Sequence, residues 1–235
     1  MSELPEPLPA LDFPESDGAP MGESGDHIEA IIDLLAQLRH RYRERDDTYI
    51  GSNQFMYWEP TDPKQSVCPD IYLAFGRPSL PFRRTWKIWE EDGHAPDLVV
   101  EVTSPSTRHI DRGAKRGLYG SLGVRELVLF DPLDEYLRPR LQGFRLAGDT
   151  LERIPASPAG VYLQTVGVWL RAEGKRVQAW SEAGERLPAP WHDFEQVWAE
   201  REALAVERDA LVDERDAMAA RLAAVEAELA RLRGG

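Results

Sequence analysis

The sequence predicts one α/β domain, preceded by a disordered tail and followed by a long charged helix. Short apolar runs at residues 71–75 (IYLAF) and 126–130 (ELVLF) have the length and composition of buried strands. Residues 111–123 (DRGAKRGLYGSLG) lie between the strand-like run 97–103 and the run 126–130, and they predict a short helix that ends at Gly123. Strand, helix and strand in succession indicate a βαβ-like crossover that covers one face of a sheet.

Three segments with different composition define the expected organisation. Residues 1–26 are rich in Pro, Gly, Ser and acidic residues, so we expect a disordered tail. Residues 27–190 form the domain, which begins with an amphipathic helix at 27–45 whose start Asp26 could cap. Its apolar positions recur at helical spacing: Ile28, Ile31, Ile32, Leu35 and Leu38. Residues 191–235 form the charged C-terminal helix.

Composition and charge limit the classes of protein that the chain can represent. Of its 235 residues 42% are hydrophobic, which suffices for one well-buried domain with extensions. The single cysteine, Cys68, fits a reducing compartment, and the absence of a signal sequence or a 20-residue apolar run predicts a cytoplasmic protein without membrane contact. The net charge of −13 divides into −7 for residues 1–46, −1 for 47–190 and −5 for 191–235. The central domain is therefore nearly neutral, which permits nucleic acid as a substrate.

Two carboxylates at strand-like runs form the candidate metal site. Asp70 follows Pro69 at the start of one apolar run, and Glu101 lies inside the next one. An ionised glutamate in an apolar strand is costly unless it is paired, protonated or bound to a metal. Asp97 lies on the same strand face as Glu101 but about 13 Å away, so these two cannot readily share one ion. Asp70 and Glu101 on neighbouring strands could hold Mg²⁺ or Mn²⁺, completed by water.

Lys115 is the candidate third member of this site. Asp111, Lys115 and Tyr119 are four residues apart and share one face of the predicted helix, which can return over the end of the Glu101 strand. A lysine there could orient an attacking water and offset charge on a phosphate. A purely structural ion pair with Glu101, or an ordinary solvated lysine, would look identical in sequence. We interpret His27 as a helix-start residue, Cys68 as buried packing and Tyr119 as a core residue.

The segment 96–132 (PDLVVEVTSPSTRHIDRGAKRGLYGSLGVRELVLFDP), together with residues 67–76 and 86–93, carries a family resemblance. The chain resembles the bacterial Uma-type endonucleases of the restriction-endonuclease-like, PD-(D/E)XK superfamily, over roughly residues 27–185. The resemblance implies a central mixed sheet flanked by helices, with Asp70 and Glu101 as the acids. Thr103 stands where the superfamily pattern has its lysine, and in this family the lysine of the next helix, here Lys115, takes that role. The glutamate that the superfamily often has on its first helix matches Glu29 weakly.

These observations lead to two hypotheses of different classes. The first is a Mg²⁺-dependent endonuclease that hydrolyses phosphodiester bonds of DNA, with Asp70 and Glu101 as metal ligands and Asp70, Glu101 and Lys115 as catalytic residues. The second is a catalytically inactive module that keeps the nuclease fold and assembles through its C-terminal helix. The acidic tails and Thr103 favour the second, whereas the segment 96–132 favours the first. Convergence of the Asp70 and Glu101 carboxylates near the Lys115 amine would favour the enzyme.

The C-terminal helix carries a seven-residue repeat. One stripe is apolar throughout, and the partner stripe contains three arginines: Val197, Leu204, Leu211, Met218, Val225 and Leu232, and beside them Phe194, Arg201, Arg208, Arg215, Leu222 and Leu229. Arginine at core-type positions predicts a weak coiled coil with one favoured register, and a solitary helix stabilised by Glu–Arg pairs is the alternative.

We expect a homodimer that associates through residues 194–233, because a helix this polar is only marginally stable alone in water. Light scattering should give the mass of a dimer for the full chain and of a monomer for residues 1–190. A full-length protein that stays monomeric at high micromolar concentration would exclude this assembly.

Overall fold

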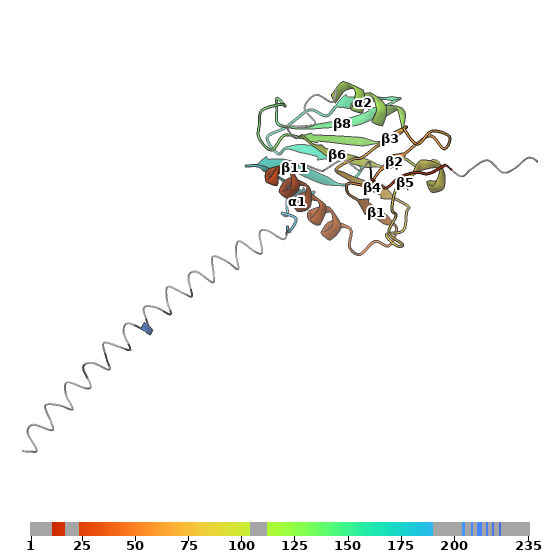
Figure 1. Ribbon diagram of the computed structural model, residues 1–235. Helices are drawn as coiled ribbons and strands as arrows, with labels where there is room; N and C mark the ends of the chain where they lie inside the picture. The colour runs from red at the N-terminus through yellow and green to blue at the C-terminus, as the bar shows by residue number, and fades with distance from the viewer. Residues whose placement is uncertain are drawn as a thin grey trace, which may run out of the picture. The chain divides into compact units, whose positions relative to one another are not determined.

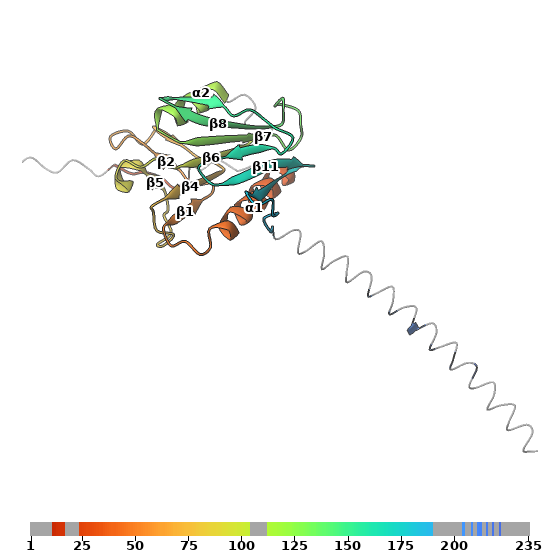
Figure 2. The same cartoon turned by 180° about the vertical axis from the view of Figure 1, so that it is seen from behind.

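The computed structural model describes residues 11–16, 24–103 and 112–189, and single positions between 204 and 221. The chain divides into two compact units, Met1–Ala189 and Pro190–Gly235. The coiled coil and the dimer contact fall almost entirely outside the described residues and stay predictions. The fold below is that of the first unit (Figures 1 and 2).

A mixed six-stranded sheet forms the centre of this unit, as the sequence predicted. Its order is β1-β4-β6-β7-β8-β9. β6 and β7 run parallel, and the other neighbouring pairs are antiparallel. The bounds are β1 Thr48–Gly51, β4 Ile71–Phe75, β6 Leu98–Val102, β7 Glu126–Phe130, β8 Leu141–Ala147 and β9 Thr150–Arg153. The parallel β6–β7 pair confirms the predicted crossover.

Two small sheets complete the strands. One has the order β10-β11-β12, and the other has the order β3-β2-β5. Their bounds are β10 Val161–Leu163, β11 Val168–Glu173, β12 Arg176–Ser181, β3 Ser66–Val67, β2 Met56–Tyr57 and β5 Trp86–Lys87. A 3₁₀ turn, η1 (Ile88–Glu91), follows β5. Residues 48–58 contribute to two different sheets, through β1 and β2.

Two α-helices pack on the described domain. α1 (Gly25–Arg41) contacts β12, β1 and β6, and α2 (Arg112–Ser121) contacts β9. The Ser24 side chain caps α1 by accepting a hydrogen bond from the His27 N–H, so the expectation that Asp26 caps this helix was wrong. Ile28 and Ile32, which we placed on the apolar face, are exposed, whereas Ile31 and Leu38 are buried.

Alternation along the central strands produces one apolar core on each face of the sheet. Leu98, Val100 and Val102 of β6 belong to the core beneath α1 and β10–β12. Val99, between them, belongs to the opposite core, which includes Tyr119 of α2. Successive side chains of a strand point to opposite faces, so Glu101 shares the α2 face with Val99. The face opposite α2 is thus covered by α1 together with the β10-β11-β12 sheet, rather than by helices alone (Figure 1).

Part of the N-terminal segment docks on the domain, so the expected disorder of residues 1–26 is wrong for residues 11–16. The Phe13 ring lies 5.1 Å from the rings of both Tyr57 and Trp89. The Tyr57 hydroxyl donates a hydrogen bond of 2.5 Å to the Pro14 carbonyl, and Arg84 pairs with Glu15. Aromatic packing of Phe13 against β2 and η1, together with the contacts of Pro14 and Glu15, therefore anchors this hexapeptide.

Within the described ranges, no helix combines the length and the apolar character that crossing a bilayer requires.

Phe13→Ala should lower the free energy of unfolding by about 1–2 kcal/mol, because the half-buried ring loses its aromatic contacts. Thermal unfolding followed by circular dichroism measures this change. Deletion of residues 1–10 is the matched control and should leave the melting temperature unchanged. Equal stability of Phe13→Ala and the wild type would show that residues 11–16 contribute nothing to the fold.

Candidate active site

The register of two central strands brings Asp70 and Glu101 together. β4 and β6 are antiparallel, with Ile71 opposite Val100 and Tyr72 opposite Val99. Continuing this register by one residue sets Asp70 opposite Glu101. Tyr72 and Val99 belong to the core on the α2 face. Asp70 lies two residues before Tyr72 and Glu101 two residues after Val99, so both carboxylates point to that face as well. Opposite residues of an antiparallel pair have Cβ atoms about 5 Å apart.

Glu101 is a buried carboxylate with two donors from α2. Its side chain is 9% exposed. Oε2 accepts a hydrogen bond of 2.8 Å from the Lys115 amine, and Oε1 accepts one of 2.5 Å from the Tyr119 hydroxyl. Lys115 and Tyr119 are one helical turn apart, so one face of α2 supplies both donors. The helix and the strand are therefore joined by a charge-assisted pair and a neutral donor at one carboxylate.

Asp70 is held at the mouth of β4 by backbone groups. Its Oδ2 accepts a hydrogen bond of 2.6 Å from the Val102 N–H of β6. Ser52 fixes the backbone itself, because its hydroxyl donates to the Asp70 carbonyl at 2.6 Å. The other carboxylate oxygen, Oδ1, lies 3.7 Å from Nε2 of His27 in the first turn of α1. The side chain therefore lies between β6 and the first turn of α1, and Ser52 fixes the backbone that carries it.

Burial and neighbouring charge determine the electrostatics of the pair. Burial raises the pKa of Glu101 above its usual value; Lys115 opposes this rise, and the Asp70 charge adds to it. Burial also raises the pKa of Tyr119 well above 10, and the negative charge of Glu101 raises it further. Tyr119 therefore remains a protonated donor. Lys115 offsets the effect of burial on the pKa of Glu101 only in part, so this pKa stays raised.

The donor set fits a hard divalent cation. Two carboxylates repel each other across adjacent strands, and carboxylate oxygens are the ligands that Mg²⁺ prefers. Thr103, on the same strand face as Glu101, has a buried hydroxyl without a hydrogen-bond partner in the described structure. No group of three or more His, Cys, Asp or Glu side chains in the described residues could hold a metal ion. Two carboxylates, with further oxygen donors from backbone, hydroxyl or water, are therefore the available set.

Other predicted or considered residues lie elsewhere. Glu29 is half exposed and pairs with Arg176 at 3.1 Å, away from the carboxylate pair. Asp97 is buried at the opposite end of β6, where it accepts from the Phe75 N–H and pairs with Arg125. Asp111 lies outside the described residues, and Cys68 is half buried rather than buried. Asp97 and Glu101 thus lie at opposite ends of β6, as their spacing along an extended strand predicted.

Two residues that contact the carboxylate pair were not predicted as site residues from the sequence. Tyr119, interpreted as a core residue, is fully buried but also donates to Glu101. The signal was its position four residues after Lys115, on the same helix face. His27, interpreted as a helix-start residue, is 2% exposed and faces Asp70. No pattern in the sequence places His27 beside Asp70, because that contact depends on how α1 crosses the sheet.

The domain is thus a mixed α/β protein with a carboxylate pair, a lysine and a tyrosine at one end of its central strands. The family model Uma2, described as "Putative restriction endonuclease", matches residues 3–173. The chain therefore belongs to the Uma2 family, as the segment 96–132 indicated.

Comparison with solved structures finds a chain described as "a putative nuclease belonging to DUF820" from Anabaena variabilis ATCC 29413. The two chains share 16% sequence identity with a TM-score of 0.45, over 61% of this chain and 74% of that one. No curated protein is significantly similar to this chain.

Lys115→Met should destabilise the domain by about 2–4 kcal/mol at pH 8, because it leaves Glu101 buried without its counter-charge. The pKa of Glu101 is already raised, and loss of Lys115 raises it further. At a pH between the two pKa values, Glu101 is protonated in the folded variant but ionised in the unfolded chain. The free energy of unfolding therefore falls as pH rises toward the pKa of the folded state.

The deficit of Lys115→Met should therefore shrink as pH is lowered, because protonation of Glu101 removes the buried charge that has lost its partner. Urea unfolding at several pH values measures it. Lys64→Met, at an exposed lysine, is the control and should cost little at any pH. A deficit of equal size at pH 5 and pH 8 would contradict the assigned charge pair.

Proposed function

We propose that this protein is a divalent-cation-dependent endonuclease that hydrolyses phosphodiester bonds of DNA. The observation that carries the proposal is the pairing of Asp70 with Glu101 across β4 and β6, with the Lys115 amine 2.8 Å from Glu101. Membership of the Uma2 family, whose model is described as "Putative restriction endonuclease", supports the same class of reaction. Buried like charges held together by backbone and helix donors are typical of functional sites.

In this proposal Asp70 and Glu101 hold Mg²⁺ or Mn²⁺. The cation, when bound, supplies positive charge that polarises the phosphodiester group and offsets the charge that develops during hydrolysis. The Val102 N–H keeps Asp70 oriented, and the Tyr119 hydroxyl keeps Glu101 oriented. Preorganised groups of this kind do not need to reorient as the reaction proceeds.

Lys115 has two roles in the proposal. In the described structure its charge stabilises the buried Glu101 carboxylate, and its side chain is 22% exposed. An amine at the edge of the site can also orient the attacking water and approach a phosphate oxygen. Lysine is a compact cation with three rotatable donors, which suits both contacts. Thr103 lacks a charge, so we assign the cationic role of the superfamily pattern to Lys115.

The inactive assembly module makes a different prediction for the same residues. A structural Glu101–Lys115 ion pair needs neither Asp70 nor a cation. The Asp70 carboxylate beside Glu101 raises the pKa of Glu101 and so weakens such a pair. The enzyme hypothesis explains this unfavourable proximity, and cation binding by the two acids separates the hypotheses.

Asp70→Ala and Glu101→Ala should each abolish a weak Mn²⁺ binding that the wild type displays in calorimetry, because one carboxylate cannot replace two. Lys115→Met is expected to bind Mn²⁺ no less tightly. Asp149→Asn, at an exposed residue, is the control and should bind as the wild type does. Unchanged Mn²⁺ affinity in both alanine variants would reject the metal site.

Lys115→Met should lower the rate of DNA cleavage by about 10²–10³ under conditions where the variant is folded, the range typical for loss of one electrostatic stabiliser. Turnover on plasmid and linear DNA with Mg²⁺ or Mn²⁺ measures it. Lys64→Met is the control and should retain the wild-type rate. Full activity of Lys115→Met would assign the cationic role to another residue.

A further inference from the structure

A cavity lies at the opposite end of β4 from the carboxylate pair. Its volume is about 280 Å³. Thr48 of β1, which lines it, is paired with Phe75 at the end of β4, five residues beyond Asp70. At about 3.3 Å per strand residue, the cavity is about 17 Å from Asp70 along the strand. We call it the basic pocket; the residues that matter here are Arg39, Arg43, Arg45, Thr48 and Phe82.

The charge of the basic pocket differs from that of the whole chain. Three arginines and one acid, Asp46, line it, whereas the chain carries a net charge of −13. Arg39 makes no hydrogen bond or ion pair with the described residues. Arg43 and Arg45 pair with Glu44 and Asp47, but these pairs are solvent-exposed and contribute little to stability. An incoming anion can therefore compete for their guanidinium groups.

The floor of the pocket contains a polar group without a partner. Thr48 is 4% exposed, and its hydroxyl has no hydrogen-bond partner within the described structure. A buried hydroxyl without a partner costs free energy. Because Thr48 lines the pocket, its hydroxyl is a donor that a bound phosphate would satisfy.

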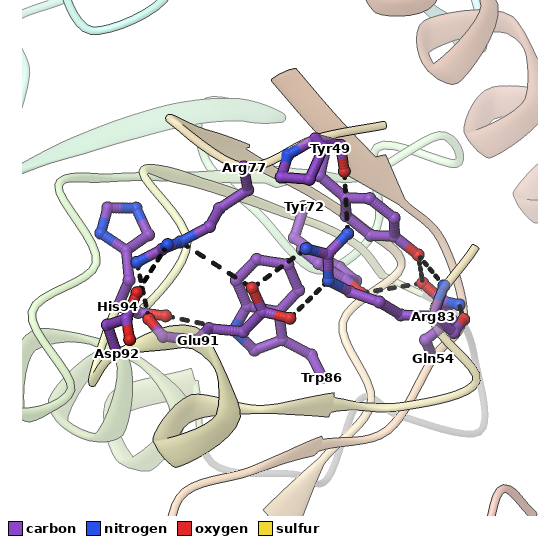
Figure 3. Close-up of polar contacts among 10 residues, drawn as sticks. Tyr49, Gln54, Tyr72, Arg77, Arg83, Trp86, Glu91, Asp92 and His94 are labelled. Carbon is purple, nitrogen blue, oxygen red and sulfur yellow. Dashed lines mark hydrogen bonds and ion pairs between the residues drawn. The ribbon is translucent and has the colours of Figure 1, made fainter. Parts of the chain in front are cut away.

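An exposed aromatic ring lies at the rim. Phe82 is 75% exposed, which is unusual for so large an apolar side chain. The neighbouring residue Arg83 anchors its loop: the Arg83 guanidinium pairs with Glu91 and lies 4.4 Å from the Tyr49 ring centroid. Figure 3 shows Arg83 among Tyr49, Tyr72, Trp86 and Glu91.

Further contacts fix the same loop. Arg83 donates to the Pro78 carbonyl, and the Gln54 amide donates to the Arg83 carbonyl. The cluster in Figure 3 therefore holds the backbone on either side of Phe82, while the ring itself remains exposed.

We propose that the basic pocket binds one nucleotide of a single-stranded DNA segment, with the arginines on phosphate and Phe82 stacked on the base. Positive grooves with exposed aromatic rings are the general means of binding unpaired strands, because every base has a face on which a ring can stack. This inference rests on the proposed function and specifies the substrate as a strand with unpaired bases. At the spacing of a fully stacked strand, about 3.4 Å per nucleotide, some five nucleotides would span the distance from the pocket to the carboxylates.

The arginines also have a local explanation, which the test must separate. Arg39, His40 and Arg41 lie in the last turn of α1, where the helix dipole favours positive charge. Arg41 carries the same charge in the same turn but does not line the pocket. It is the matched control for Arg39. Leu80, 63% exposed on the loop of Phe82 but outside the lining, is the matched control for Phe82.

The experiment measures fluorescence anisotropy of a labelled single-stranded DNA 12-mer with the full-length chain in EDTA, so that no strand is cut. Arg39→Ala and Phe82→Ala should each weaken binding about tenfold, and Arg39→Ala should reduce the slope of log affinity against log salt by about 0.7. Arg41→Ala and Leu80→Ala should bind within about twofold of the wild type. A circular dichroism melt verifies that each variant is folded.

Several outcomes would overturn the inference. Equal losses in Arg41→Ala and Arg39→Ala would indicate general attraction to α1 rather than a pocket. A duplex 12-mer that binds as tightly as the single strand, with no effect of Phe82→Ala, would reject base stacking. Competition by deoxyadenosine monophosphate as strong as that by the oligonucleotide would assign the pocket to free nucleotides.

The two proposals can fail separately. Loss of binding in Arg39→Ala and Phe82→Ala, in a protein that cleaves no DNA with Mg²⁺ or Mn²⁺, supports the pocket and rejects the endonuclease. If Arg39→Ala and Phe82→Ala bind and cleave DNA as the wild type does, the pocket proposal is rejected and the endonuclease proposal is unaffected.

Discussion

Glu101 carries a carboxylate into the apolar face of a six-stranded sheet, where a charge is stable only if donors lie close to it. α2 supplies two such donors, Lys115 and Tyr119, so the crossover helix is held at a defined position over β6. The backbone of β6 in turn holds Asp70 through the Val102 N–H. One buried charge thus links a strand, its neighbour and the helix above them.

α1 connects this end of the sheet with the basic pocket. Its first turn brings His27 to Asp70, and its last turn carries Arg39 to the pocket. Arg39 lies twelve residues after His27, a rise of about 18 Å along the helix, which is comparable to the separation of about 17 Å along β4. The helix is pinned in register by a buried amide network, in which Gln37 bonds to the Val177 carbonyl and the Ala179 N–H of β12. A displaced α1 would therefore disturb both sites.

Buried carboxylates are common in this domain, and only their surroundings distinguish them. Asp131 accepts hydrogen bonds from the backbone N–H groups of Leu133, Tyr136 and Leu137. Burial raises the pKa of Asp131, but these N–H groups lower it by more, so the backbone of one turn stabilises the charge. Glu126 accepts from two backbone N–H groups and from Arg145. Glu101 differs because its pKa is raised and a second acid adjoins it. That difference identifies the candidate site among several buried acids.

The sequence by itself determined the strands 71–75 and 126–130 and the β6–α2–β7 crossover, because period-two and helical spacing are local properties. It also singled out Asp70, Glu101 and Lys115 as candidate site residues. Tertiary structure decided what local spacing cannot encode. The β4–β6 register sets Asp70 opposite Glu101, the crossing of α1 brings His27 to them, and docking of Phe13 orders residues that composition alone marked as a tail. Each of these contacts joins segments far apart in the chain, and its free energy comes from burial that only the assembled domain provides.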